Sequence, residues 1–258
     1  PDGPGFSLTE APVSITLNAL IVVGASVAAA LAIHVALGRL IRSSRVSEAE
    51  STAGVTMEAM ANLYGVLLAF ILSGAWGRLD DARSMLTHEA NALLDLKQIA
   101  RLLPAPTRDE LESGIEAYRY GVLEELRRPE DRRPLEHPDS TLNRLWQIAA
   151  AYDPETPGQT ELQSRALDTL EELGDQRRLR IRAFQRPVPG ILWTILIGGA
   201  VVVISLTALT STGGRLPAAY VALLAAMISF GLFAIWVLSH PVRSGLAASA
   251  PYLAAWPR

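Results

Sequence analysis

The chain lacks cysteine altogether, although it is 258 residues long. This absence excludes disulfide bonds, thiolate metal sites and cysteine nucleophiles. The four histidines lie far apart, and His88-Glu89 has no second histidine at helical spacing. A zinc site of the metalloprotease type therefore has no support, and no other group of residues predicts a metal site or a cofactor.

The sequence also lacks the patterns that mark nucleotide-binding and catalytic sites. None of its 19 glycines falls into Gly-x-Gly-x-x-Gly or P-loop spacing. Asp80 and Asp81 lie between Arg78 and Arg83, which is more typical of a solvated ion-pair patch than of paired acid–base carboxylates. The net charge is −3, and the basic residues do not gather on a nucleic-acid-binding motif. We therefore expect neither an enzyme nor a nucleic-acid-binding protein.

Charged residues are almost absent from four long stretches, in a chain that is 50% hydrophobic with a mean hydropathy of +0.24. Apart from Glu58, none of these stretches contains Asp, Glu, Lys or Arg. Each is long enough to cross a bilayer as a helix, and the first lacks the basic run and cleavage motif of a signal peptide. The predicted membrane spans are Ile15–Gly38, Thr56–Trp76, Val188–Gly214 and Leu216–Val242.

The segment between the second and third stretches shows helical periodicity and no strand signal. Its first apolar positions, from Leu79 to Leu103, continue the second stretch at spacings of three and four, so we expect one long helix that leaves the membrane and buries these positions. A second helix is expected to begin at Thr107, whose spacing to Glu110 resembles a capping box, and its apolar positions run at the same period from Leu111 to Leu126. Asp139 or Ser140 is a candidate cap for a third helix. A turn at Pro157-Gly158 is expected to separate it from a fourth helix, which follows through Leu162–Phe184.

These features predict an all-α, four-span integral membrane protein with a cytoplasmic extension built of long helices. Residues 1–12 carry Gly and Pro without periodicity and are expected to be poorly ordered or to form an interfacial tail, and residues 127–138 are expected to form a charged loop. His34 in the first span is expected to be packed or interfacial. The predicted domains are a transmembrane hairpin (1–78), a cytoplasmic helical domain (79–187), a second transmembrane hairpin (188–242) and a tail (243–258).

The arginines indicate the orientation in the membrane. With four spans, both termini and the helical extension share one side, and that side carries Arg78, Arg83, Arg177, Arg178, Arg180, Arg182, Arg186 and Arg243. The other side has only Arg39, Arg42, Arg45 and Arg215. Because Lys and Arg favour the cytoplasmic side, the helical extension and both termini are predicted to be cytoplasmic.

The second stretch carries one face that is less lipid-like than the others, because residues three or four apart share a helix face. An ionisable group within a span is a candidate functional group, but Glu58 lies near the beginning of the stretch, and snorkelling towards the headgroups explains it equally well. The face itself fits either close helix packing at small residues or a conduit. We call this face the stripe, and its candidate pore-lining residues are Glu58, Asn62, Val66, Phe70 and Ser73.

Three separated segments recur in the same order in a known family: Leu63–Phe70 followed by Trp76, then Glu89–Leu93, then Leu173–Arg180 leading to Leu192-Trp193. In these segments the chain resembles the bestrophin-like family of bacterial membrane proteins. The resemblance covers most of the chain and implies a multi-pass protein of the bacterial inner membrane.

Residues 75–83 are also similar, more distantly, to a segment of the bestrophin channels. That similarity implies a homo-pentameric, chloride-type channel whose second helix lines a narrow apolar neck. The neck positions that it implies are Phe70, Val66 and Asn62, and the residues expected at the cytoplasmic mouth are Arg78, Asp81 and Arg83.

Two residues depart from that pattern. Asn62 is polar where the resemblance implies an apolar residue, and Glu58 one turn away would place a ring of negative charge at the pore, favouring cations. The acidic calcium-binding cluster of the eukaryotic bestrophins has no counterpart in residues 241–258, so calcium gating is not implied.

We therefore expect an ion channel that assembles with copies of itself, as a homo-pentamer by the resemblance, around the second span in the lipid bilayer. The alternative is a structural or accessory subunit that packs against a larger membrane complex. In that case the stripe is a contact surface and conducts nothing.

Overall fold

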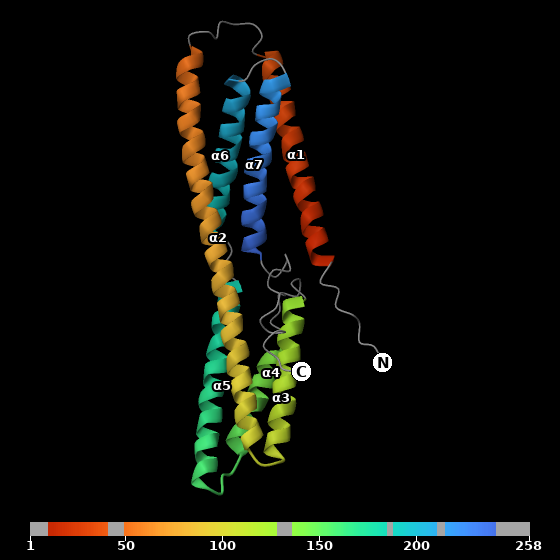
Figure 1. Cartoon of the computed structure of the whole chain (residues 1–258), viewed down its shortest axis with the longest axis vertical. Helices are drawn as coiled ribbons and strands as arrows, with labels where there is room; N and C mark the ends of the chain where they lie inside the picture. Colours follow the sequence, from red (N-terminus) through yellow and green to blue (C-terminus); the bar gives the residue numbers. More distant parts are fainter. Residues whose placement is uncertain (1–9, 41–48, 128–135, 185–187, 211–214, 241–258) are drawn as a thin grey trace. The chain divides into compact units, whose positions relative to one another are not determined.

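The computed structural model describes residues 10–40, 49–127, 136–184, 188–210 and 215–240. Within this part of the chain every regular element is an α-helix and no strand is present, which confirms the expected all-α class. The helices, drawn in Figure 1, are α1 (Glu10–Leu40), α2 (Ala49–Leu102), α3 (Thr107–Arg127), α4 (Glu136–Ala151), α5 (Pro157–Phe184), α6 (Gly190–Thr210) and α7 (Arg215–Ser239).

Four of these helices are long and apolar enough to cross a membrane, as the sequence predicts. Three of the apolar stretches are Ile15–Arg39 in α1, Gly190–Leu209 in α6 and Leu216–Ser239 in α7. The fourth begins at Met57 in α2, and this helix continues without a break to Leu102 through a charged part that starts at Arg78. At about 1.5 Å per residue, it is far longer than the roughly 30 Å of a hydrocarbon core. The expectation that the second span continues as one long helix is therefore confirmed.

The chain divides into two compact units, and the divisions fall at Gly77/Arg78, Arg186/Pro187 and Ser239/His240. The membrane unit contains α1, the first part of α2, α6 and α7. The helical unit contains the rest of α2 with α3, α4 and α5. The expected tail, most of the charged loop, and Arg42 and Arg45 lie outside the described residues.

Small side chains bring the helices of the membrane unit close together. α1 packs against both α6 and α7, and its contacts include Ala30 beside Ala208 and Val221. His34 of α1 is only 8% exposed, in keeping with the expectation of a packed residue. Because small residues let helix backbones approach, this packing suits a membrane, where van der Waals contact replaces the hydrophobic effect between helices.

The first part of α2 packs against α6 and α7 at two glycines. A Cβ atom at Gly199 of α6 would lie 2.6 Å from the ring of Tyr64, and one at Gly231 of α7 would lie 2.8 Å from Leu68. The Tyr64 hydroxyl donates a hydrogen bond of 3.1 Å to the carbonyl oxygen of Leu196. One face of α2 therefore packs against α6 and α7.

The Gly199→Ala variant is expected to destabilise the membrane unit by about 1–3 kcal/mol, because the added methyl group overlaps the Tyr64 ring. Gly198→Ala is the matched control, since nothing lies within 4 Å of a Cβ atom there. Thermal unfolding in detergent measures both. Equal melting temperatures for the two variants would contradict the close approach of Tyr64 to α6.

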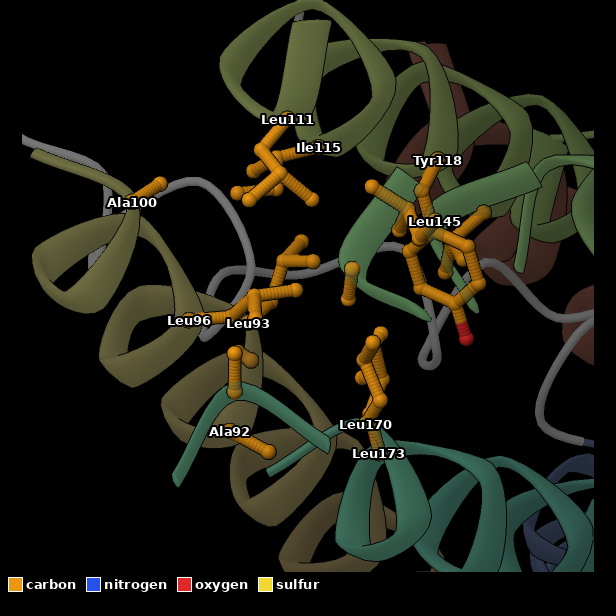
Figure 2. Close-up of a cluster of buried hydrophobic side chains, with 14 of the residues drawn as sticks. Ala92, Leu93, Leu96, Ala100, Leu111, Ile115, Tyr118, Leu145, Leu170 and Leu173 are labelled. Atoms are coloured by element: carbon orange, nitrogen blue, oxygen red, sulfur yellow. The ribbon is translucent and has the colours of Figure 1, made fainter. Parts of the chain in front are cut away.

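The helical unit has one continuous apolar core. All apolar positions predicted for α2 between Leu79 and Leu103, and for α3 between Leu111 and Leu126, are buried. Figure 2 shows side chains from four helices pointing into this core, among them Leu93 and Leu96 of α2, Leu111, Ile115 and Tyr118 of α3, Leu145 of α4, and Leu170 and Leu173 of α5. The period of the sequence therefore identified the buried faces correctly.

Two helix starts are capped differently from expectation. The amide of Glu110 donates to the carbonyl of Pro106 at 3.1 Å, so the capping box predicted with Thr107 is not formed. A capping box is found instead at α5, which begins at Pro157, where a turn was expected. There the Gln159 amide donates to Thr156 Oγ1 at 3.3 Å, and the Gln159 side-chain oxygen accepts from the Thr156 amide. Proline fits the first helical turn because its missing N–H has no partner there in any helix.

Other boundaries differ by a few residues. α1 begins at Glu10, so the last residues of the expected leader are helical, and residues 1–9 lie outside the described part. α4 begins at Glu136, ahead of the expected caps Asp139 and Ser140, because a first turn tolerates Pro138. α6 begins at Gly190, two residues after the predicted start of the third span at Val188, and residues 211–214 of that span lie outside the described part.

Candidate functional site

The five candidate pore-lining residues are all exposed on α2 in the membrane unit. Among them Phe70 is 73% exposed and Val66 is 54% exposed. The opposite face of the same helix carries Tyr64, Ile71 and Ala75, which are buried against side chains of α6 and α7. None of the described residues therefore covers the stripe, which is available to lipid, to another protein or to an ion path.

Glu58 lies one residue beyond the start of the apolar part of α2 at Met57. Its side chain is exposed and forms no ion pair with any residue that the structure describes. A carboxylate in this place fits both interpretations made from the sequence, since it is shallow enough to snorkel and lies on the stripe.

The predicted mouth residues follow the stripe along α2, at the start of the helical unit. Arg78 is half-buried, and its Nε has no hydrogen-bond acceptor among the described residues. Asp81 is exposed and Arg83 is half-buried. Neither Asp80 nor Asp81 forms an ion pair within the described chain, so the expected patch is solvated but is not a set of ion pairs.

A buried charge network, which the sequence analysis did not predict, joins α2, α3 and α5. Arg180 donates from Nε to Glu89 Oε2 and from Nη2 to Glu125 Oε2, the second bond being 3.0 Å long. Arg177 Nη1 donates to the same Glu125 oxygen at 3.4 Å. The Tyr118 hydroxyl donates to Glu89 Oε1 at 2.6 Å. These five residues are called the charge network below.

Four of the five side chains of the charge network are buried, Glu125 is partly exposed, and the charges balance. Glu89 is fully buried and Arg180 is 2% exposed. Burial, with the charge of Glu89 added to it, raises the pKa of Tyr118 well above its ordinary value, so the phenol keeps its proton and donates. Burial alone would lower the pKa of Arg180, but the charges of Glu89 and Glu125 outweigh it and raise that pKa. Two carboxylates thus neutralise two guanidinium groups.

The sequence contains a signal for this network, which is the presence of charged residues at positions that the helical period places on buried faces. Glu89 falls on the buried face of α2 beside Leu86 and Leu93, and Arg177 and Arg180 continue the buried period of α5. A charge at a core position requires a buried partner of opposite sign. The contact joins two of the three segments on which the family resemblance rests.

A family model and a solved structure are similar to this chain. Residues 24–248 match a family model described as Bestrophin-like domain. A mutant of a bacterial bestrophin homologue from Klebsiella pneumoniae has a similar solved structure, with a TM-score of 0.57 and 17% identity, covering 90% of this chain and 94% of that chain. At this identity the likeness shows the fold alone, and a comparison with curated proteins finds no match. Because the family model covers well over half of the chain, this protein belongs to the Bestrophin-like family.

Proposed function

We propose that the protein is an oligomeric membrane ion channel whose pore is lined by the stripe of α2. The observation that carries the proposal is the exposure of the whole stripe while the opposite face of α2 is buried. A helix that keeps polar and small residues uncovered at membrane depth needs a wet cavity or a protein neighbour for them. The structural likeness to a bacterial bestrophin homologue and the distant similarity of residues 75–83 to the bestrophin channels favour the cavity.

The residues of the stripe divide the proposed pore into two parts. Glu58 and Asn62 form its polar end, where rings of carboxylates and amides attract cations. Val66 and Phe70 form an apolar constriction, which can gate by dewetting. Ser73 follows towards the mouth residues Arg78, Asp81 and Arg83. No cofactor and no catalytic residue takes part in this function.

The pore requires several copies, because one chain presents the stripe on its outside. A ring of chains around α2 encloses the five candidate residues, and the bestrophin resemblance supports five copies. Cysteines introduced at Ser73, which is exposed, are expected to crosslink between copies more readily than cysteines at Leu72, its half-buried neighbour. Crosslinked species on a denaturing gel measure the difference, and equal yields would argue against an axial α2.

The proposed location is the bacterial inner membrane with the helical unit in the cytoplasm, for which the arginine asymmetry is the support. A reporter fused after Trp146 tests the orientation. Periplasmic activity of the reporter would invert the proposed topology.

The second candidate function is a structural or accessory subunit of a larger membrane complex. The open space at Gly65 and Gly77 favours it, since nothing lies within 4 Å of a Cβ atom at either and a partner helix could approach closely. Recording the purified protein in a planar bilayer under a salt gradient separates the two functions. Currents with a defined reversal potential support the channel, and their absence under all conditions supports the accessory subunit.

A further inference from the structure

The charge network joins the two helices of the helical unit that connect it to the membrane unit along the chain. The first part of α2 carries the stripe, and α5 is followed along the chain by α6. We propose that Glu89 and Arg180 are positioning residues for conduction, which hold α2 against α5 at one rotation and one register and so set how often the pore opens. This inference rests on the proposed channel function and concerns how the opening of that channel is controlled.

Stability alone does not account for the charge network. The helical unit already has a continuous apolar core (Figure 2). Replacing a buried ion pair by apolar residues of similar volume is often neutral or stabilising, so buried charges are weak contributors to stability as such. A planar guanidinium that donates to two carboxylates is far more directional than an apolar contact. The distinctive contribution of Arg180 is therefore a fixed arrangement of α2, α3 and α5.

The geometry of α2 links this arrangement to the stripe. Glu89 and Ile71 are 18 residues apart, which is about five helical turns, so they lie on the same face of α2. Ile71 is buried in the membrane unit, and Glu89 is buried in the helical unit. Phe70 is exposed and lies about 100° around the helix from Ile71. α2 is one unbroken helix from Ala49 to Leu102, so Glu89 and Phe70 belong to the same element.

The test replaces the charges and keeps the packing. A triple variant, Glu89→Met with Arg180→Met and Tyr118→Phe, leaves the Arg177–Glu125 pair in place. We expect its melting temperature in detergent to stay within about 5 °C of the wild type. Single-channel recording is expected to show an open probability changed by about fivefold or more, the scale of ordinary coupling between sites. Unitary conductance and reversal potential stay at the wild-type values, because the stripe is unaltered.

The matched control is Glu161→Gln with Arg165→Gln, which removes an exposed ion pair on α5 and should leave the open probability unchanged. A folded triple variant with wild-type open probability would overturn the inference. If the triple variant does not fold, Tyr118→Phe alone decides, since it removes one hydrogen bond to Glu89 and should shift the open probability in part. A silent wild type rejects the proposed channel, whereas an active wild type with unaffected variants rejects this inference alone.

Discussion

The Glu89→Ala variant is expected to lower the stability of the helical unit by about 3–5 kcal/mol, because it removes one partner of a buried ion pair. Arg180 keeps its bond to Glu125 but loses the acceptor of its Nε, and the Tyr118 hydroxyl loses its acceptor as well. Unsatisfied buried donors bear their full desolvation penalty. Circular dichroism during heating in detergent should show a midpoint lower by roughly 10 °C.

The control for this prediction is Arg165→Ala, which breaks the exposed pair with Glu161 on α5. Both side chains of that pair are about two-thirds exposed, so its loss should change the stability by less than about 1 kcal/mol. Similar melting temperatures for Glu89→Ala and Arg165→Ala would show that the charge network is not held as the structure describes.

The Glu58→Gln variant is expected to reduce the cation preference of the channel. Under a tenfold salt gradient a perfectly cation-selective pore reverses near 59 mV. If the ring of carboxylates supplies about 1 kcal/mol of attraction, its loss lowers the preference about fivefold and moves the reversal potential towards zero. Reversal potentials of the wild type and the variant in planar bilayers measure this change. An unchanged, chloride-directed value in both would remove Glu58 from the pore.

The Phe70→Ala variant is expected to raise the unitary conductance severalfold, because it widens the proposed apolar constriction and eases its wetting. Its selectivity should change little, since Glu58 and Asn62 remain. Leu223→Ala is the matched control, because Leu223 is also a large exposed apolar residue but lies on α7, away from the stripe. Equal conductances for the wild type and both variants would place the constriction elsewhere.

Hydropathy and periodicity were sufficient for most of the fold. They predicted the four spans, the continuation of α2 beyond the membrane, and the buried positions from Leu79 to Leu103, because each depends on residues that are neighbours along one helix. Helix starts were less predictable. Glu136 and Pro157 begin helices where a loop and a turn were expected, because proline is compatible with a first turn as well as with a break.

The candidate site, like the fold, was predicted from the sequence only in part. The sequence by itself determined that the stripe from Glu58 to Ser73 lies on one face, since helical spacing follows from residue number. Only the tertiary structure decided that this face is uncovered and that Tyr64 and Ile71 turn towards α6 and α7. It also decided the charge network, whose bonds from Arg180 span 91 and 55 residues of sequence. Such a pair forms only where folding brings two helix faces together, and no local pattern specifies which faces meet.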